Sequence, residues 1–162
     1  MRFKSRYFLC EVVLEEPRCR QNITQSVVLY NVKNTVARMH GDFGAAAVSV
    51  GLSVKYLNAY TGVILLRCRK EFHQLLWSSL PFISSLENRG HRYPCFINTL
   101  HVGGTIRTCQ KFLIQYNRQQ LSLLLKECTD PDEKETIRKS IASCTLQNVE
   151  ESEYIAEYEE ME

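Results

Sequence analysis

Residues 48–70 read VSVGLSVKYLNAYTGVILLRCRK, and their first half has the clearest alternation in the chain. Apolar residues alternate there with small or polar ones, at Val48, Val50, Leu52, Val54 and Tyr56. Alternation with period two predicts a half-buried strand. Residues 58–62 are typical of a turn, and the apolar run from Val63 to Lys70 then predicts the partner strand of a hairpin.

The second strand of this hairpin has one apolar and one basic face. Because successive side chains of a strand point to opposite faces, Arg67 and Arg69 share one face, and Ile64, Leu66 and Cys68 share the other. We therefore expect a sheet that is buried on one side and carries arginines on the other.

The flanking segments predict the other elements. They are a strand over 2–14, a helix between Asn22 and Gly41 with a capping box at its start, a helix over 72–86 kinked by Pro81, a strand over 93–102, a helix from Thr105 and a short helix from Pro131 with Asp130 as its N-cap. The order β-α-β-β-α-β-α-α predicts an α+β, ferredoxin-like (split βαβ) sandwich with an antiparallel sheet, helices on one face and extra C-terminal helices.

Charge is distributed unevenly along the 162 residues. Residues 1–118 carry sixteen of the twenty Lys and Arg and six of the eighteen Asp and Glu, a net charge of +10, while the rest carry −8. We expect one domain over 1–146 and an acidic, disordered tail over 147–162. A basic body indicates a polyanionic partner such as nucleic acid, and the alternative is a solvated surface whose cations lie early in the chain.

Cysteine and histidine patterns predict no metal site. The seven cysteines form no CxxC pair, which is typical of a reducing compartment, and the four histidines have no metal-like spacing. No secretory signal and no membrane-spanning stretch is expected, so membranes are not expected partners.

The junction over residues 100–111, LHVGGTIRTCQK, has a candidate phosphate site. An extended run ends at Gly103 and Gly104, and a helix with a basic face follows Thr105, so backbone N–H groups and cations converge. The alternative is an ordinary strand-to-helix turn with Thr105 as helix cap.

Five blocks together carry a specific resemblance over roughly residues 1–128. They are GDFGAAA (41–47), YLNAYTG (56–62), LLRCRK (65–70), GHRYPCF (90–96) and LHVGGTIR (100–107). In this order they resemble the Pop-five protein subunit family of eukaryotic nuclear ribonuclease P and ribonuclease MRP.

The resemblance implies a non-catalytic, RNA-binding subunit of these ribonucleoproteins, located in the nucleus and nucleolus. It would brace the catalytic domain of the RNA for 5′ leader removal from precursor tRNA and for precursor rRNA processing, with magnesium on the RNA and no cofactor on the protein. Implied partners are the catalytic RNA and other protein subunits, among them a small subunit of similar fold, with precursor tRNA contacted indirectly. The RNA-binding residues expected from the resemblance and the basic hairpin are Arg67, Arg69, Gly103, Gly104, Thr105, Arg107 and Lys111.

Two alternative functions are also compatible with the sequence. One is a protein-interaction module that mainly assembles other subunits of an RNA-processing complex, through an open sheet face or strand edge. The other is a free-standing nuclease that uses His101 as acid or base, although the sequence pairs no second group with it.

Overall fold

The computed structural model describes residues 3–59, 61–127 and 129–143. The chain divides into two compact units, Met1–Thr105 and Ile106–Glu162. The first contains β1 (Ser5–Leu14), η1 (Pro17–Asn22), α1 (Gln25–Ser49), β2 (Ser53–Asn58), β3 (Val63–Arg69), η2 (Lys70–Phe72), α2 (His73–Ser79), η3 (Leu80–Phe82), β4 (Ser85–Asn88) and β5 (His91–Gly103). The second contains α3 (Ile106–Glu127) and α4 (Pro131–Ser143).

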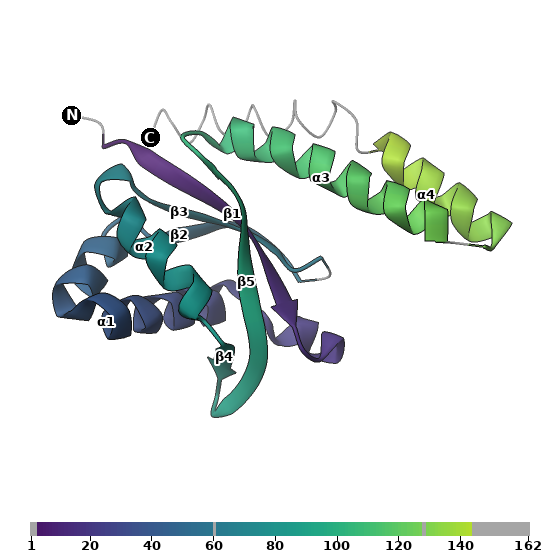
Figure 1. Ribbon diagram of the computed structural model, residues 1–162. Coiled ribbons are helices and arrows are strands. Elements are labelled where there is room, and N and C mark those ends of the chain that lie inside the picture. The colour runs from purple at the N-terminus through teal and green to yellow at the C-terminus, as the bar shows by residue number, and fades with distance from the viewer. Residues whose placement is uncertain (1–2, 60, 128, 144–162) are drawn as a thin grey trace. The chain divides into compact units, whose positions relative to one another are not determined.

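The strands of the first unit form one five-stranded sheet in the order β2-β3-β1-β5-β4. All neighbouring strands are antiparallel, as predicted. The long β5 bends, pairing with β4 at its start and with β1 along the rest of its length, while α1 and α2 lie on the same side of the sheet (Figure 1). The prediction of an α+β protein with an antiparallel sheet is confirmed.

The core lies between this sheet and the helices α1 and α2. It contains Ile64, Leu66 and Cys68, the apolar face predicted for β3, together with Phe8 of β1 and Val32 of α1. Arg67 and Arg69 alternate with them, are half-buried and so belong to the opposite face. Period two therefore predicted correctly which residues share a face of β3, but the arginine face is also buried at Val63 and Leu65, which was not expected.

The predicted strand over 48–56 is wrong in its first half. The helix α1 is interrupted at Gly41, where φ is +73°, and then continues to Ser49, so β2 begins only at Ser53. Gly44, Ala47 and Val48 are buried at helical spacing, whereas Val50 is exposed. The helical period and the helix-favouring alanines at 45–47 therefore prevailed over the local alternation.

The predicted helix over 72–86 is wrong beyond Ser79. Pro81 falls in the single turn η3, and β4 follows as an edge strand that pairs with the start of β5. The buried side chain of Asn31 on α1 binds the backbone of β4: Nδ2 donates to Glu87 O at 3.1 Å, and Glu87 N donates to Oδ1 at 2.9 Å. An amide side chain thus satisfies backbone groups of the edge strand that a further strand would otherwise pair.

The cap of α1 also differs from the prediction. Thr24, and not Asn22, is the N-cap, since its Oγ1 accepts a hydrogen bond from Val27 N at 3.3 Å. Asn22 is the last residue of η1. Because η1 extends through Asn22, α1 begins only after Thr24, two residues beyond the predicted cap.

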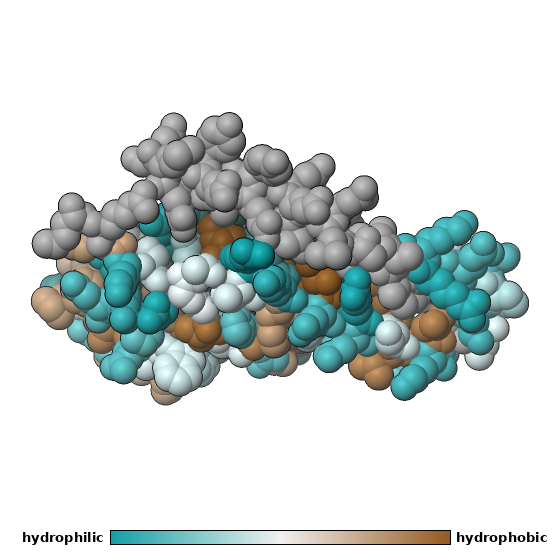
Figure 2. Space-filling model, turned by 90° about the horizontal axis from the view of Figure 1, so that it is seen from above, coloured by the Kyte–Doolittle hydropathy of each residue, from teal (hydrophilic) through white to brown (hydrophobic). Residues whose placement is uncertain are grey.

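In the second unit, α3 packs against α4. Asp130 caps α4 as predicted, because its Oδ1 accepts from Asp132 N at 3.0 Å. The visible side chains at the α4 end are mostly hydrophilic (Figure 2). The tail predicted over 147–162 and the boundary predicted at 146 lie outside the described residues. No helix in the described part of the chain has the length and apolar character needed to cross a membrane.

Candidate nucleic-acid interface

The start of β1 brings together two segments that are far apart in the sequence. In the sheet, Ser5 lies opposite Arg69 and Tyr7 opposite Arg67 on the β3 side, while Tyr7 lies opposite Gly103 on the β5 side. Four predicted site residues, Arg67, Arg69, Gly103 and Gly104, therefore meet at one end of the sheet.

Among the described residues, one side-chain hydrogen bond holds Arg67. Its Nε–H donates to Ser5 Oγ at 3.0 Å, and the side chain is half-buried. A guanidinium has five N–H donors, so this contact orients Arg67 and leaves its Nη groups able to serve another acceptor. Fixed, planar donors of this kind are suited to phosphate oxygens.

Arg69 is positioned by a ring and by a glycine. Its Cζ lies 4.1 Å from the centroid of the Phe3 ring, a cation–π contact, and the ring is 57% exposed. A Cβ on Gly51 would come within 2.8 Å of Arg69 Cγ. The absence of a side chain at Gly51 therefore makes room for Arg69.

Arg6 belongs to this site, although the sequence did not place it there. A Cβ on Gly104 would lie 3.1 Å from Arg6 Nη1, so the glycine admits the guanidinium close to the end of β5. Arg6 pairs in register with Cys68, which faces the core, and so lies on the opposite face from Arg67 and Arg69. Burial raises the pKa of the Cys68 thiol to about 12, and the charge of Arg6 acts more weakly in the other direction.

Five cations thus gather at this end of the first unit. Lys70 N donates to Lys4 O at 2.9 Å, which places these two exposed lysines beside the arginines, and Glu71 follows Lys70 in η2. We call Lys4, Arg6, Arg67, Arg69 and Lys70 the basic end. Among the described residues, none of the five forms an ion pair with a carboxylate.

Gly103 and Gly104 do not form a sharp turn. Gly103 is the last residue of β5, and neither Gly103 nor Gly104 has the positive φ found at Gly41, Gly62 and Gly90. Thr105 is exposed and directly precedes α3. The close approach of Arg6, and not backbone conformation, is what Gly104 permits.

Arg107 and Lys111 belong to the second unit. They stand four residues apart on α3 and are both exposed, and Arg118 falls on the same helical face. The structure therefore brings these cations together along one helix.

Arg6 was absent from the predicted site, although the alternation of Arg2, Lys4 and Arg6 in the sequence was a signal for it. Which residues surround Arg6 depends on the order of the strands in the sheet, and the sequence does not give that order.

Comparison with known families covers most of this interface, and Lys4 of the basic end lies just before the matched residues. The Rpp14/Pop5 family model matches residues 6–114, which is more than half of the chain and includes Arg6 and Lys111. The chain belongs to the Rpp14/Pop5 family. Every residue predicted to contact RNA lies within the part of the chain that is typical of Rpp14/Pop5 proteins.

Curated Rpp14/Pop5 relatives match nearly end to end. The chain is 65% identical over 153 residues to the human protein named ribonuclease P/MRP protein subunit POP5, which covers 94% of each chain. It is 67% identical over 147 residues to the mouse protein of that name, covering 90% of this chain and 87% of the relative. A chain of the yeast ribonuclease MRP structure aligns with a TM-score of 0.48 and 15% identity, over 76% of this chain and 98% of that one, too weak a likeness to support an argument.

Proposed function

We propose that this chain is a protein subunit of the ribonucleoproteins ribonuclease P and ribonuclease MRP. The observation that carries the proposal is the identity with the human subunit over nearly the whole length of both chains. The basic end supports it, because its cations, which have no carboxylate partner within the described part of the chain, are available to the phosphates of an RNA. Such contacts position an RNA without reading its sequence.

We infer that the protein braces its RNA and does not itself cleave. The basic end consists of three arginines and two lysines, and side chains of these types bind phosphate through their N–H donors. The RNA, with magnesium ions on it, would perform the cleavage that removes the 5′ leader of precursor tRNA and processes precursor rRNA. Arg67 and Arg69 would neutralise phosphates that otherwise repel each other where the RNA folds tightly.

The proposal also covers the type of fold, the partners of the chain and its location. Leaving β4 aside, the order β2-β3-β1-β5 with α1 and α2 on one face supports a ferredoxin-like frame with one added edge strand. Its other partners would be protein subunits of the particle, including one of similar fold. The protein would act in the nucleus and nucleolus, and contact with precursor tRNA would be indirect.

A second candidate function is assembly of other protein subunits. It is favoured by large apolar side chains exposed on the helices, including Phe43 and Val50 near the end of α1 and Trp77 on α2. Apolar side chains of this size that remain in water are typical of protein-binding surfaces. The two functions are compatible, because these residues and the basic end lie on different elements.

The proposal is tested by replacing the endogenous subunit of human cells with a tagged copy of this chain. We expect both catalytic RNAs to co-purify, the purified particle to remove the 5′ leader of a precursor tRNA, and the isolated chain to cleave nothing. Absence of both RNAs from the purified material would contradict the proposal. Metal-dependent cleavage by the highly purified chain that His101→Ala abolishes would contradict the non-catalytic role.

Charge reversal separates the two candidate functions. Arg67→Glu with Arg69→Glu should reduce RNA crosslinking at least tenfold and leave the pull-down of protein subunits unchanged. The matched control is Arg18→Glu with Lys33→Glu, which changes the net charge equally at exposed positions of η1 and α1. Loss of protein subunits with RNA crosslinking intact would favour the assembly function instead.

A further inference from the structure

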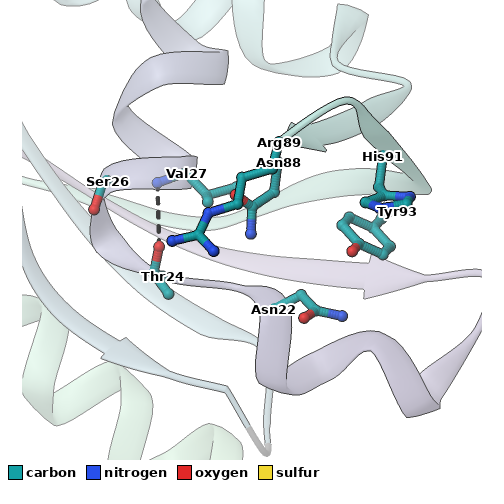
Figure 3. Close-up of a pocket in the computed structure, with 8 residues that line it drawn as sticks. All are labelled: Asn22, Thr24, Ser26, Val27, Asn88, Arg89, His91 and Tyr93. Carbon is teal, nitrogen blue, oxygen red and sulfur yellow. Dashed lines mark hydrogen bonds between the residues drawn. The ribbon is translucent and has the colours of Figure 1, made fainter.

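A cavity of about 690 Å³ lies at the end of β5 that is remote from the basic end (Figure 3). It is lined by Asn22, Thr24, Ser26, Val27, Asn88, Arg89, His91 and Tyr93. His91 is the first residue of β5 and Gly103 the last. At about 3.3 Å per residue, these two ends are separated by up to about 40 Å along the strand. The cavity is therefore separate from the interface described above.

The side chains that line the cavity include no carboxylate. They offer a guanidinium, an imidazole, the amides of Asn22 and Asn88, and hydroxyl groups. The carboxylate of the same hairpin is already occupied, since Glu87 Oε1 accepts from Arg92 Nε at 2.8 Å. Within the described part of the chain, no ion pair is formed by Arg89. In this hairpin, Glu87 neutralises the charge of Arg92, whereas no carboxylate of the described residues neutralises that of Arg89.

Arg89 is also directed at the start of α1. Its side chain points from the turn toward Thr24, and His91 and Tyr93 lie together on the other side of the cavity (Figure 3). The first turn of α1 has no acidic residue, and the N-terminal end of a helix carries partial positive charge. The guanidinium and the helix end would both attract an anion bound between them. Arg89 supplies the charge for such an anion, His91 offers a ring nitrogen for a hydrogen bond, and the helix only lines one wall.

We propose that this cavity binds one nucleotide of an RNA, with its phosphate at Arg89. The inference rests on the proposed function, in which the chain is bound to RNA. A guanidinium donates two parallel hydrogen bonds to a phosphate, and histidine and tyrosine rings are the kind of surface on which unstacked bases of RNA lie. The volume lies in the range of small-molecule sites, whereas a lone inorganic phosphate would leave most of it empty.

The turn supplies a variant that removes the charge without harming the fold. Arg89 and Gly90 are the two central residues of the β4–β5 hairpin, with φ of +51° and +82°. Such a turn prefers Asn or Asp at its first central position, because these residues tolerate a left-handed backbone better than arginine does. Arg89→Asn should therefore keep or raise the melting temperature while it removes the guanidinium.

The test measures binding of the full-length chain to a single-stranded fragment of the catalytic RNA, over a range of salt concentrations. Arg89→Asn should weaken binding by threefold to tenfold and reduce the slope of log affinity against log salt by about one. Arg92→Asn, in the same hairpin but with its guanidinium already bound to Glu87, is the matched control and should change affinity by less than twofold. Equal affinities and slopes for wild type and Arg89→Asn would overturn the inference.

Two further measurements show whether a negative result contradicts this inference alone or the proposed function as well. Arg69→Gln at the basic end is titrated in parallel: if it weakens RNA binding and Arg89→Asn does not, this inference fails and the proposed function stands. A wild-type chain that binds no RNA overturns both. Inorganic phosphate is added while the NMR signals of His91 and Tyr93 are followed, and shifts with phosphate alone, without an effect of Arg89→Asn on RNA, would overturn RNA as the ligand.

Discussion

The start and the middle of β1 lie in two different environments. Phe8 and Cys10 of β1 are fully buried in the core, whereas Ser5 and Arg6, at the start of the same strand, lie among cations. The core is held by many apolar contacts, and the basic end by a few polar ones and one cation–π pair. The core supplies the rigidity with which the basic end presents its charges, because Arg67 and Arg69 flank the buried Cys68.

The largest expected effect comes from emptying the core. Leu66→Ala removes a fully buried side chain next to Arg67 and should lower the free energy of unfolding by about 2–5 kcal/mol, from lost transfer energy and a cavity. The free energy of unfolding is measured by urea denaturation of the full-length chain. Leu124→Ala, an exposed position of α3, is the matched control and should cost less than about 0.5 kcal/mol. Equal losses would contradict the location of the core.

The polar link between α1 and β4 should rank next. Asn31→Ala leaves the backbone N–H and C=O of Glu87 without their partner and should cost about 1–3 kcal/mol. Faster hydrogen exchange at the Glu87 amide should accompany the loss in stability. Asn34→Ala, exposed on the same helix, is the control. An unchanged exchange rate at Glu87 would show that Asn31 does not hold the edge strand.

The buried thiols make the stability of the core depend on alkaline pH. Burial raises the pKa of Cys68 from 9.0 to about 12 and that of Cys95 from 9.0 to about 11. Above pH 9 the thiols of the unfolded chain ionise while the folded ones stay protonated, so unfolding releases protons and stability falls as pH rises toward the folded values. Each thiol contributes up to about 1.4 kcal/mol per pH unit in this window.

The test compares unfolding free energies at pH 8, 9 and 10 for the wild type and for Cys68→Ala with Cys95→Ala. The double variant should be less stable at pH 8 but lose less stability with rising pH. Cys19→Ala, outside the core, should leave the pH dependence as in the wild type. Identical slopes for the double variant and the wild type would be inconsistent with protonated thiols in the core.

The smallest effect on stability is expected at the basic end. Arg67→Ala loses one hydrogen bond to Ser5 and should change the free energy of unfolding by less than about 0.5 kcal/mol. Its effect should appear in RNA binding, where the salt slope falls by about one. Lys33→Ala, an exposed cation of α1, should leave the slope unchanged. A slope unaffected by Arg67→Ala would remove Arg67 from the RNA contacts.

Parts of the fold were predictable where one local period dominated. The assignment of Arg67 and Arg69 to one face of β3, the turn before Val63 and the cap at Asp130 were predicted correctly, because each depends on neighbouring residues alone. The strand over 48–52 and the helix over 80–86 were wrong. In both segments the local pattern is compatible with a helix and with a strand. Packing against the rest of the first unit favoured the structure that was not predicted.

The candidate site, too, could be predicted from the sequence only in part. Arg67 and Arg69 could be assigned to one face from their spacing, and the family of the chain from its sequence blocks. The neighbourhood of Arg6 and Gly104 could not be predicted, because it depends on the pairing of β1 with β5. Arg89 gave no signal either, since the segment around it resembled an ordinary loop.

From the sequence alone follow the class of the fold, the family, the two faces of β3 and the excess of positive charge in the first 118 residues. Tertiary structure decided where that charge gathers and which arginines are neutralised: Arg92 meets Glu87, while Arg89 and the basic end meet no carboxylate among the described residues. The reason is physical. Periodicity is a property of neighbours along the chain, whereas the field at a surface depends on charges that strand pairing brings together from distant segments.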